Sequence, residues 1–426
     1  MASKAGPPRG MRDFLPAEKR HRDAVLATIS SRYQHHGFDP IDTPALEDHN
    51  TLHSGLGGDN EKLSFQVLRR GLGLSDLEHV GSLDELTDLG LRFDLTVPLA
   101  RYVATHRSEL PSVFRALHIA PVWRAERPQK GRYRQFVQCD IDIVGDASSL
   151  AERELLIASA DALDALGVSG YRFRVNDRRL LTAVLESAGV AGDQHLSVLI
   201  TLDKLDKIGI DGVLEELGTR HGETLDLDAM RGFLERASQQ VALDAPSIAR
   251  AMAAPEDLAA ELVGWAGDVA QLIGPEKVVF DPTLVRGMGY YTGSIIELFH
   301  PEMGVSLGGG GRYDGMVGRF LGEDVPACGF SLGFERLIDV VDQTRHTTSP
   351  GRSLVYTDQT PLRELLRLKA ELIAAGYSVV LAESKKNKKA LFSELETLGV
   401  TQVAQLDTEV PPADQLNWRE LGESQG

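Results

Sequence analysis

Two short segments alternate apolar and polar residues, as a β-strand with one functional face would. The polar positions are Arg92, Asp94 and Thr96 in residues 92–97, and Gln138, Asp140 and Asp142 in residues 138–143. Carboxylate and amide groups on a shared sheet face would suit a ligand that carries an ammonium group or N–H donors. The simpler alternative is a polar face in contact with water, which is common for a strand of an antiparallel sheet.

A strongly basic loop lies between the two segments. Residues 124–134 hold five cations and one acid, with Pro128 and Gly131 marking a turn. Guanidinium groups bind phosphate oxygens in pairs, so phosphate is the expected partner, and a solvated surface loop is the alternative. Neither a GxxxxGK[ST] loop nor a GxGxxG that opens a helix after a strand occurs. A phosphate site here would therefore depend on side chains.

Three glycine-containing segments further along add cations and hydroxyl groups. Residues 284–293 contain Arg286 and the paired Tyr290 and Tyr291, together with glycines that allow a close approach to the backbone. We interpret Gly308–Gly311 as a glycine-rich loop that forms a tight turn or meets a ligand, with a flexible hairpin as the alternative. Residues 329–337 have the pattern of a strand followed by a helix. Arg336 in that helix could contact an anion, although a surface salt bridge with Glu335 is the alternative.

The composition limits the class of protein. The chain has 426 residues, of which 42% are hydrophobic and 25% charged, and its net charge is −17. Two or three globular domains are therefore expected, and any nucleic-acid binding would use local positive patches. Two cysteines, Cys139 and Cys328, exclude a disulfide scaffold and a cysteine-rich zinc site. No secretory signal and no apolar run long enough to span a membrane is visible, so we expect a cytoplasmic enzyme without a membrane partner.

The residue pattern changes along the chain. Strand-like segments and loops extend to about Gly170, helical spacing dominates from about Leu180 to Gly274, and strand-like segments then return. Residues 347–351 (Thr-Thr-Ser-Pro-Gly) are the best linker candidate, and strands and helices alternate beyond them. We predict a catalytic domain in two parts, a helical insertion and a small C-terminal α/β domain. Their bounds are 1–180 and 276–346 for the catalytic domain, 181–275 for the insertion and 352–426 for the C-terminal domain.

Five segments, in this order, closely resemble the histidyl-tRNA synthetases, a family of class II aminoacyl-tRNA synthetases. Residues 122–136 and 329–337 look like the second and third class motifs, and residues 284–293 and 306–315 look like the two histidine-specific motifs. The resemblance covers residues 8–340, with a weaker first class motif near Pro44–Glu47. It implies an α+β fold: a class II synthetase-like antiparallel sheet with flanking helices, a helical insertion and a small C-terminal α/β domain.

The resemblance also implies the reaction and the histidine site. Members of the family activate histidine with ATP and Mg²⁺, transfer it to the 3′ end of tRNA(His), and usually form homodimers. By this similarity Asp94, Thr96 and Gln138 would hold the α-ammonium group of histidine. Asp142 and Tyr291 would bind the imidazole nitrogens, and Tyr290 would line the same pocket.

The nucleotide site follows from the same resemblance. Arg124 would bind the ATP α-phosphate and the substrate carboxylate, and Arg286 would be the electrophilic catalyst at the α-phosphorus. Arg132 and Arg336 would meet the β- and γ-phosphates or stack near the adenine, with Glu126 close to the adenine. The sequence does not define metal ligands, and Mg²⁺ would be carried mainly by the ATP phosphates.

Two features depart from the family pattern. Gly289 stands where many members have an acid, which bears on how Arg286 and the tyrosines are held. Residues 353–406 resemble the family's anticodon-binding domain, but its usual final strand and helix are hard to find after Leu406. Residues 352–426 hold nine Lys or Arg and eleven Asp or Glu, so this domain is not broadly basic. The lysines of residues 385–389 could meet RNA phosphates or could simply begin a solvated helix.

Two other functions remain open at this point. The chain could be a catalytically inactive, synthetase-like regulatory subunit of ATP phosphoribosyltransferase that senses histidine. Such paralogues usually lose the ATP-binding arginines, whereas Arg124, Arg132 and Arg336 are present here. The chain could also be a histidine-adenylating paralogue with an acceptor other than tRNA, an alternative that the reduced C-terminal domain motivates.

Overall fold

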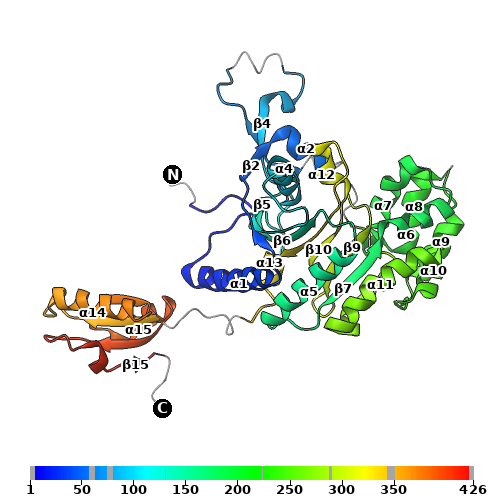
Figure 1. Cartoon of the computed structure of the whole chain (residues 1–426). Helices are drawn as coiled ribbons and strands as arrows, with labels where there is room; N and C mark the ends of the chain where they lie inside the picture. Colours follow the sequence, from blue (N-terminus) through cyan, green and yellow to red (C-terminus); the bar gives the residue numbers. More distant parts are fainter. Residues whose placement is uncertain are drawn as a thin grey trace. The chain divides into compact units, whose positions relative to one another are not determined.

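The computed structural model describes residues 5–56, 63–73, 80–129, 131–222, 224–286, 290–342 and 351–421. The chain divides into two compact units, Met1–Arg12 with Thr28–Val341, and Asp13–Ala27 with Asp342–Gly426 (Figure 1). The predicted linker at 347–351 lies outside the described residues except for Gly351. The finer division into catalytic parts and insertion stays a prediction. None of the described helices is long and apolar enough to cross a membrane.

The first unit is built on an eight-stranded sheet with the order β1-β5-β6-β11-β10-β9-β7-β8. Its central strands run antiparallel, and only the edge pairs β1–β5 and β7–β8 are parallel. The bounds are β1 Asp39–Pro40, β5 Phe114–Trp123, β6 Gln135–Val144, β7 Arg172–Asp177, β8 Val278–Phe280, β9 Ser294–His300, β10 Val305–Arg312 and β11 Ala327–Gly333. This sheet confirms the predicted class II synthetase-like architecture.

Strand β6 shows why the sheet has two distinct faces. Cys139, Ile141 and Ile143 are fully buried on one face, as the alternating pattern predicts. Helix α5 covers that face. Its Glu152 forms an ion pair with Arg312, and Arg312 lies at the end of β10 on the same face of the sheet as Ile143. The opposite face carries Gln138, Asp140 and Asp142. This polar face is available for a binding site.

Helices flank both faces of the sheet (Figure 1). Helices α5 and α11 pack against strands β6, β11, β7 and β8, whereas α4 and α12 enclose one end of the polar face together with Phe114, Ala116 and Val144. The helices of this region are α1 Pro16–His35, α2 His49–Leu56, α4 Thr96–His106, α5 Leu150–Ala165, α12 Gly315–Leu321 and α13 Phe334–Leu337. Along one side of α1, Val25, Ile29 and Tyr33 are fully buried.

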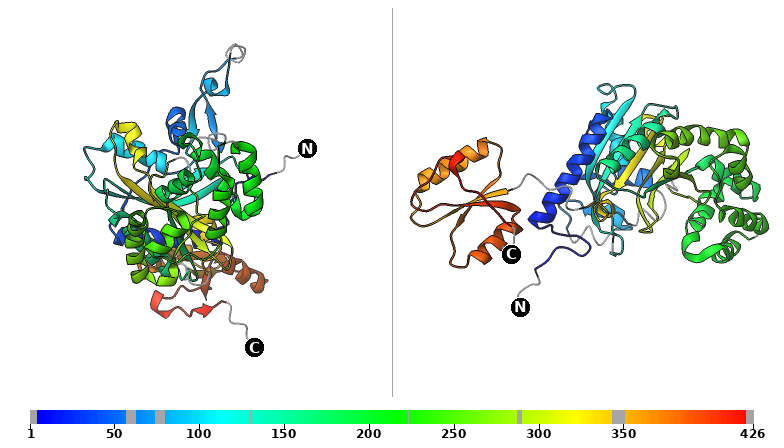
Figure 2. Two further views of the ribbon diagram at one scale, coloured as in Figure 1. Left: turned by 90° about the vertical axis from the view of Figure 1, so that its right-hand side faces the viewer. Right: turned by 90° about the horizontal axis from the view of Figure 1, so that it is seen from below.

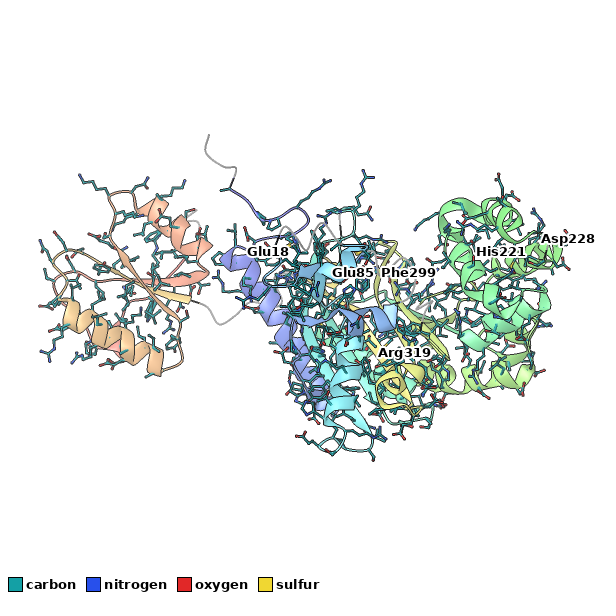
Figure 3. All side chains as sticks on the ribbon, turned by 90° about the horizontal axis from the view of Figure 1, so that it is seen from above. Glu18, Glu85, His221, Asp228, Phe299 and Arg319 are labelled. Carbon is teal, nitrogen blue, oxygen red and sulfur yellow. The ribbon has the colours of Figure 1, made fainter. Side chains whose placement is uncertain are left out.

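The predicted helical segment before Gly274 is confirmed as helical. It contains α6 Arg178–Ser187, α7 His195–Leu202, α8 Leu205–His221, α9 Leu227–Ala237, α10 Ala245–Met252 and α11 Glu256–Ile273. These helices lie between β7 and β8 in the chain, and His221 and Asp228 mark them in Figure 3. Asp177, Asp226 and Asp244 each accept a hydrogen bond from a backbone N–H in the first turn of the following helix, so three of the six helices begin at an aspartate cap.

The predicted strand at residues 92–97 is wrong. Strand β4 (Thr87–Leu91) pairs with β2 (Leu46–Asp48) and β3 (Gln66–Leu68) in a separate small sheet, and the chain then turns into α4 at Thr96. The Asp94 side chain accepts a hydrogen bond from the Val97 N–H at 3.1 Å, and Pro98 lies in the first helical turn. This local capping overrides the alternating pattern. Arg92 is buried and donates to the carbonyl oxygens of Thr43 and Pro121.

The predicted glycine-rich loop at 308–311 is also wrong. These glycines form the middle of β10, hydrogen-bonded between β9 and β11 in the large sheet. A Cβ added at Gly308 or Gly310 would lie 2.4 or 2.1 Å from a carbonyl oxygen of β11. Glycine is needed at these positions because the backbone of β11 leaves no room for a Cβ atom. Close approach of a neighbouring backbone explains glycines within a strand as well as glycines in a loop.

The C-terminal residues confirm the predicted small α/β domain. Its four-stranded sheet has the order β13-β12-β14-β15, with α14 and α15 on opposite faces (Figure 2, right). The elements are β12 Gly351–Tyr356, α14 Leu362–Ala374, β13 Val379–Glu383, α15 Lys388–Thr397, β14 Val400–Gln405 and β15 Arg419–Glu420. After β14 the described residues contain a short 3-10 turn and the two-residue β15, and no further α-helix.

Candidate active site

A pocket of about 430 Å³ opens on the polar face of the large sheet. Strands β6, β10 and β11 contribute its floor, and the loop before α4, the β5–β6 loop and the side chains of Arg286, Tyr290 and Tyr291 contribute its walls. All the residues that the sequence nominated line this one pocket: Asp94, Thr96, Arg124, Glu126, Arg132, Gln138, Asp142, Arg286, Tyr290, Tyr291 and Arg336. Residues from five distant segments are therefore brought together around a single cavity.

Three buried carboxyl groups gather on one side of the pocket. Asp94, Asp140 and Asp142 are each less than a tenth exposed, and none forms an ion pair with a cation among the described residues. Burial is the main reason that the pKa of all three groups is raised, and for Asp142 it reaches about 7. A cationic ligand would relieve this unfavourable accumulation of acid, which makes this side of the pocket suited to ammonium and N–H groups.

Gln138 offers an unused acceptor beside these acids. Its Nε2 donates to Ser331 Oγ at 3.0 Å and to Asp140 Oδ1 at 3.3 Å. Its Oε1 is buried and has no hydrogen-bond partner among the described residues. A buried polar atom without a partner costs free energy, so Gln138 Oε1 is prepared to accept a hydrogen bond from a ligand.

Aromatic side chains form a wall next to the acids. The rings of Tyr290 and Tyr291 meet edge to face with their centroids 4.6 Å apart, and Tyr290 lies 6.4 Å from Tyr313. Burial raises the pKa of Tyr290 to about 12 and also raises the pKa of Tyr291 well above its usual value, so both hydroxyl groups stay protonated at neutral pH. These hydroxyls can therefore donate as well as accept hydrogen bonds.

Arg124 lies between two aromatic rings. Its guanidinium carbon is 4.4 Å from the centroid of Phe93 and 5.1 Å from that of Phe136, and its Nε donates to the Phe93 carbonyl at 3.2 Å. Stacking and this hydrogen bond fix the plane of the guanidinium group. The remaining guanidinium nitrogens are left for an anion.

A cluster of three arginines, Arg132, Arg286 and Arg336, makes another part of the pocket positively charged. Arg336 donates to the carbonyl oxygens of Ser306 at 2.8 Å and Gly131 at 3.3 Å. Burial lowers its pKa first, and the nearby Arg132 and Arg286 lower it further. Glu126 partly balances this charge, with its carboxylate 3.7 Å from Arg132. Such crowding of positive charge favours a polyanion. The alternative for Arg336, a surface salt bridge with Glu335, is absent among the described residues, in which Glu335 pairs with Arg12.

Arg286 projects across strand β10. Its Nη1 donates to the Gly308 carbonyl at 2.9 Å, and its Nε lies 3.5 Å from Glu297 Oε1. A Cβ on Gly309 would lie 2.2 Å from Arg286 Nη1, so the missing side chain at that position makes room for the guanidinium. Residues 287–289, including the family departure at Gly289, lie outside the described residues.

The sequence interpretation missed several side chains that shape the pocket. Tyr313 donates to Asp142 Oδ1 at 2.5 Å, Ser331 accepts from Gln138, and Glu297 contacts Arg286. Asp140 was seen on the polar face but was given no role. Alternation along β9 and β11 would have indicated Glu297 and Ser331, but their importance depends on cross-strand register, which the sequence alone does not fix.

Together, the antiparallel sheet and this pocket of buried acids and clustered arginines define a class II aminoacyl-tRNA synthetase catalytic core. The family model described as "Histidyl-tRNA synthetase" matches residues 10–337 of the chain. This match covers the whole of the pocket.

Individual relatives agree with the family model. A histidine–tRNA ligase of Leifsonia xyli subsp. xyli is 52% identical over 421 residues, covering 96% of this chain and 97% of the relative. The crystal structure of histidyl-tRNA synthetase from Nostoc sp. PCC 7120 has a TM-score of 0.75 at 26% identity and covers 98% of this chain and 95% of that one.

One further structure supports the fold alone. It is described as an ATP phosphoribosyltransferase regulatory subunit/histidyl-tRNA synthetase from Bacillus halodurans C, with a TM-score of 0.76 at 22% identity, and covers 95% of this chain and 99% of that one. On the family model and the Leifsonia relative, the chain belongs to the histidyl-tRNA synthetase family.

Proposed function

We propose that this chain is a histidine–tRNA ligase, which activates L-histidine with ATP to histidyl-adenylate and transfers the histidyl group to the 3′ end of tRNA(His). The observation that carries the proposal is the single pocket in which acids and an amide lie beside clustered guanidiniums. The first group suits a cationic amino acid, and the second suits a nucleotide triphosphate. The close relatives named as histidine–tRNA ligases support the same conclusion.

In this proposal the acids and hydroxyls recognise histidine. Asp94, Thr96 and the unpartnered Oε1 of Gln138 hold the α-ammonium group. Asp142 and Tyr291 pair with the two imidazole nitrogens, and Tyr290 closes the pocket beside them. A site that pairs both ring nitrogens leaves its own buried polar groups without partners when another amino acid enters. Sites of this kind can discriminate by a factor of ~10⁴ or more.

The guanidiniums position the nucleotide for attack. Arg124 holds the substrate carboxylate and the α-phosphate, Arg132 and Arg336 hold the β- and γ-phosphates or the adenine, and Glu126 lies near the adenine. The histidine carboxylate oxygen attacks the α-phosphorus, a new O–P bond forms, and pyrophosphate leaves. Because the carboxylate is already an anion, no side-chain base is required. Arg286 stabilises the charge that develops at the α-phosphoryl oxygens.

Mg²⁺, dimer formation and location complete the proposal. Arginines and only two carboxylates, Glu126 and Glu335, line the polyphosphate end of the pocket, and no group of three or more His, Cys, Asp or Glu among the described residues could hold a metal ion. We therefore place Mg²⁺ mainly on the ATP phosphates, where it would neutralise charge. We further propose a homodimer that acts in the cytoplasm, as the family resemblance implies. The C-terminal α/β domain would contact tRNA, with the lysines at 385–389 as candidate phosphate contacts.

Exchange of labelled pyrophosphate into ATP tests the activation step. Purified protein with Mg²⁺ should catalyse exchange that depends on histidine and on none of the other amino acids. Absence of exchange would refute the ligase and favour a histidine-sensing subunit, which calorimetry would detect as histidine binding without ATP binding. Robust exchange without charging of tRNA(His) would instead indicate a different acceptor. No observation in the described residues favours either alternative over the ligase.

A further inference from the structure

Two contacts hold the guanidinium group of Arg286 in place among the described residues. Gly308 O accepts from its Nη1 at 2.9 Å, and Glu297 Oε1 lies 3.5 Å from its Nε. Its Nη2 has no hydrogen bond to any described residue. These two contacts hold Nη1 and Nε of the guanidinium group and leave Nη2 for a phosphoryl oxygen.

A second arginine, Arg174, holds the Glu297 carboxylate. Arg174 Nη1 lies 3.3 Å from Glu297 Oε2, and Arg174 Nε lies 3.3 Å from Asp281 Oδ2. The Arg174 guanidinium also covers the ring of Phe299 at 4.4 Å, a residue that Figure 3 labels. Four charged groups thus form a continuous chain from Asp281 through Arg174 and Glu297 to Arg286.

The sheet register makes this chain specific. Arg174 on β7 pairs with Glu297 on β9, and Glu297 pairs with Gly309 on β10. Directly paired residues share a face of an antiparallel sheet with their Cβ atoms about 5 Å apart, so the contacts follow from the backbone. The Glu297 side chain is only 11% exposed, and its two carboxylate oxygens each face a different arginine.

We propose that Glu297 is the positioning residue of Arg286, and that Arg174 keeps Glu297 in place. This inference rests on the proposed role of Arg286 in adenylate formation. Glu297 fixes the direction of the guanidinium and supplies a negative charge behind it, in a pocket where Arg132, Arg286 and Arg336 would otherwise repel one another. Without it Arg286 still carries its charge but samples orientations that do not reach the α-phosphate.

The test measures single-turnover formation of histidyl-adenylate by full-length wild type, Glu297→Gln, Arg286→Ala and the double variant. Gln keeps the size of the side chain and removes its charge. We expect Glu297→Gln to slow adenylate formation by ~10–10², because small misplacements of a catalytic group have effects of this size. The KM values for histidine and ATP should change by less than about 3-fold.

The double variant separates positioning from general structural support. If Glu297 acts through Arg286, the Gln substitution has little further effect once Arg286 is Ala. Multiplying effects would overturn the proposal, as would a Glu297→Gln enzyme with wild-type rate. If Glu297→Gln does not fold, Arg174→Gln, which releases Glu297 from behind, should still lower the rate several-fold, and an unchanged rate would overturn the proposal.

A matched control is available in the same unit. Glu154 forms a bidentate ion pair with Arg115, at 2.6 and 2.7 Å, and neither residue lines the pocket. Glu154→Gln should leave the adenylation rate within about 2-fold of wild type, since partly exposed ion pairs contribute little. A wild-type protein that makes no adenylate would refute the ligase itself, whereas an active wild type with an unaffected Glu297→Gln would refute this inference alone.

Discussion

Tyr313 donates its phenolic hydrogen to Asp142 Oδ1 at 2.5 Å inside the pocket. Tyr313 is 2% exposed, and the Asp142 carboxyl lies over Gly329 on the neighbouring strand, where an added Cβ would be 1.8 Å from Oδ1. One carboxylate oxygen is therefore fixed by a protein donor and by the space that a glycine provides. The other oxygen, Oδ2, has no hydrogen-bond partner among the described residues and can accept from an imidazole N–H.

Tyr313→Phe should weaken histidine binding. The substitution removes the hydroxyl that orients Asp142 and keeps the ring, so the pocket should retain its shape. A hydrogen bond to a charged acceptor contributes ~1.5–3 kcal/mol, which corresponds to a rise of about 10- to 100-fold in the KM for histidine. The KM for ATP in the same exchange assay provides the control and should remain unchanged. A parallel rise in both constants would contradict the orienting role.

The affinity for histidine should increase as the pH rises through about 7. Burial, the largest cause, raises the pKa of Asp142 from 3.8 to about 7, so the group is protonated below that pH and charged above it. The charged form is the better acceptor for an imidazole N–H. Calorimetric titrations with histidine from pH 6 to 8 would measure the dependence.

Free histidine also titrates in this range, so a variant is required as the reference. Asp142→Asn should weaken histidine binding more than ATP binding, and the ratio of wild-type to variant affinity should grow with pH because the variant lacks the titrating group. A ratio that stays flat from pH 6 to 8 would exclude Asp142 as the imidazole partner.

Asp140→Asn should stabilise the protein against unfolding at pH 8. The pKa of Asp140 is raised well above 3.8, first by burial and then by Asp142. An acid whose folded-state pKa is raised contributes stability at pH values below its unfolded pKa, and this contribution is lost as pH rises through the folded value. The variant should therefore have the higher melting temperature at pH 8, and the difference should shrink towards pH 4. Exposed Asp88→Asn serves as the control for charge alone, and an equal shift there would refute the argument.

Arg286→Ala should separate binding from catalysis. Histidine should still bind, because the acids, Gln138 and the tyrosines remain. Adenylate formation should fall by at least ~10², the usual effect of removing one preorganised charge contact in a transition state. Equilibrium histidine binding together with single-turnover adenylation would measure both quantities, and an unchanged rate would show that Arg286 is not the electrophilic catalyst.

Residue chemistry predicted the pocket better than it predicted the backbone. The family resemblance assigned Asp94 and Thr96 to the histidine site, and the alternating pattern placed them on a strand face, yet they reach the pocket from the start of helix α4. Alternation over six residues could not reveal that Asp94 would cap a helix, since a short capping interaction competes successfully with a weak strand preference. On β6 the same type of pattern was right, because ten of its residues pair with β5 and seven pair with β11.

The contacts that the sequence could not supply are those between strands. Glu297 meets Arg286, and Tyr313 meets Asp142, only because the register of β9, β10, β11 and β6 brings them together. A shift of one residue would move each of these side chains to the other face. Identifying them requires coordinates, whereas the arginines and acids could be nominated from their local clusters.

Gly309→Ala should reduce activity by acting on Arg286 without touching its charge. The added Cβ would lie 2.2 Å from Arg286 Nη1 and 3.1 Å from the Ile296 carbonyl oxygen, so the guanidinium must move away from Gly308. Because the β10 backbone is held between two strands, the arginine is the element that yields. Adenylate formation should fall by ~10², close to the effect of Arg286→Ala, since a displaced catalytic group contributes little.

Gly315→Ala is the matched control: nothing lies within 4 Å of its added Cβ, and the rate should stay at the wild-type value. Stopped-flow or quench measurement of adenylate, with melting temperatures recorded for both variants, would distinguish displacement from unfolding. A Gly309→Ala enzyme that folds normally and retains full rate would show that Arg286 need not occupy the position over Gly309 during the reaction.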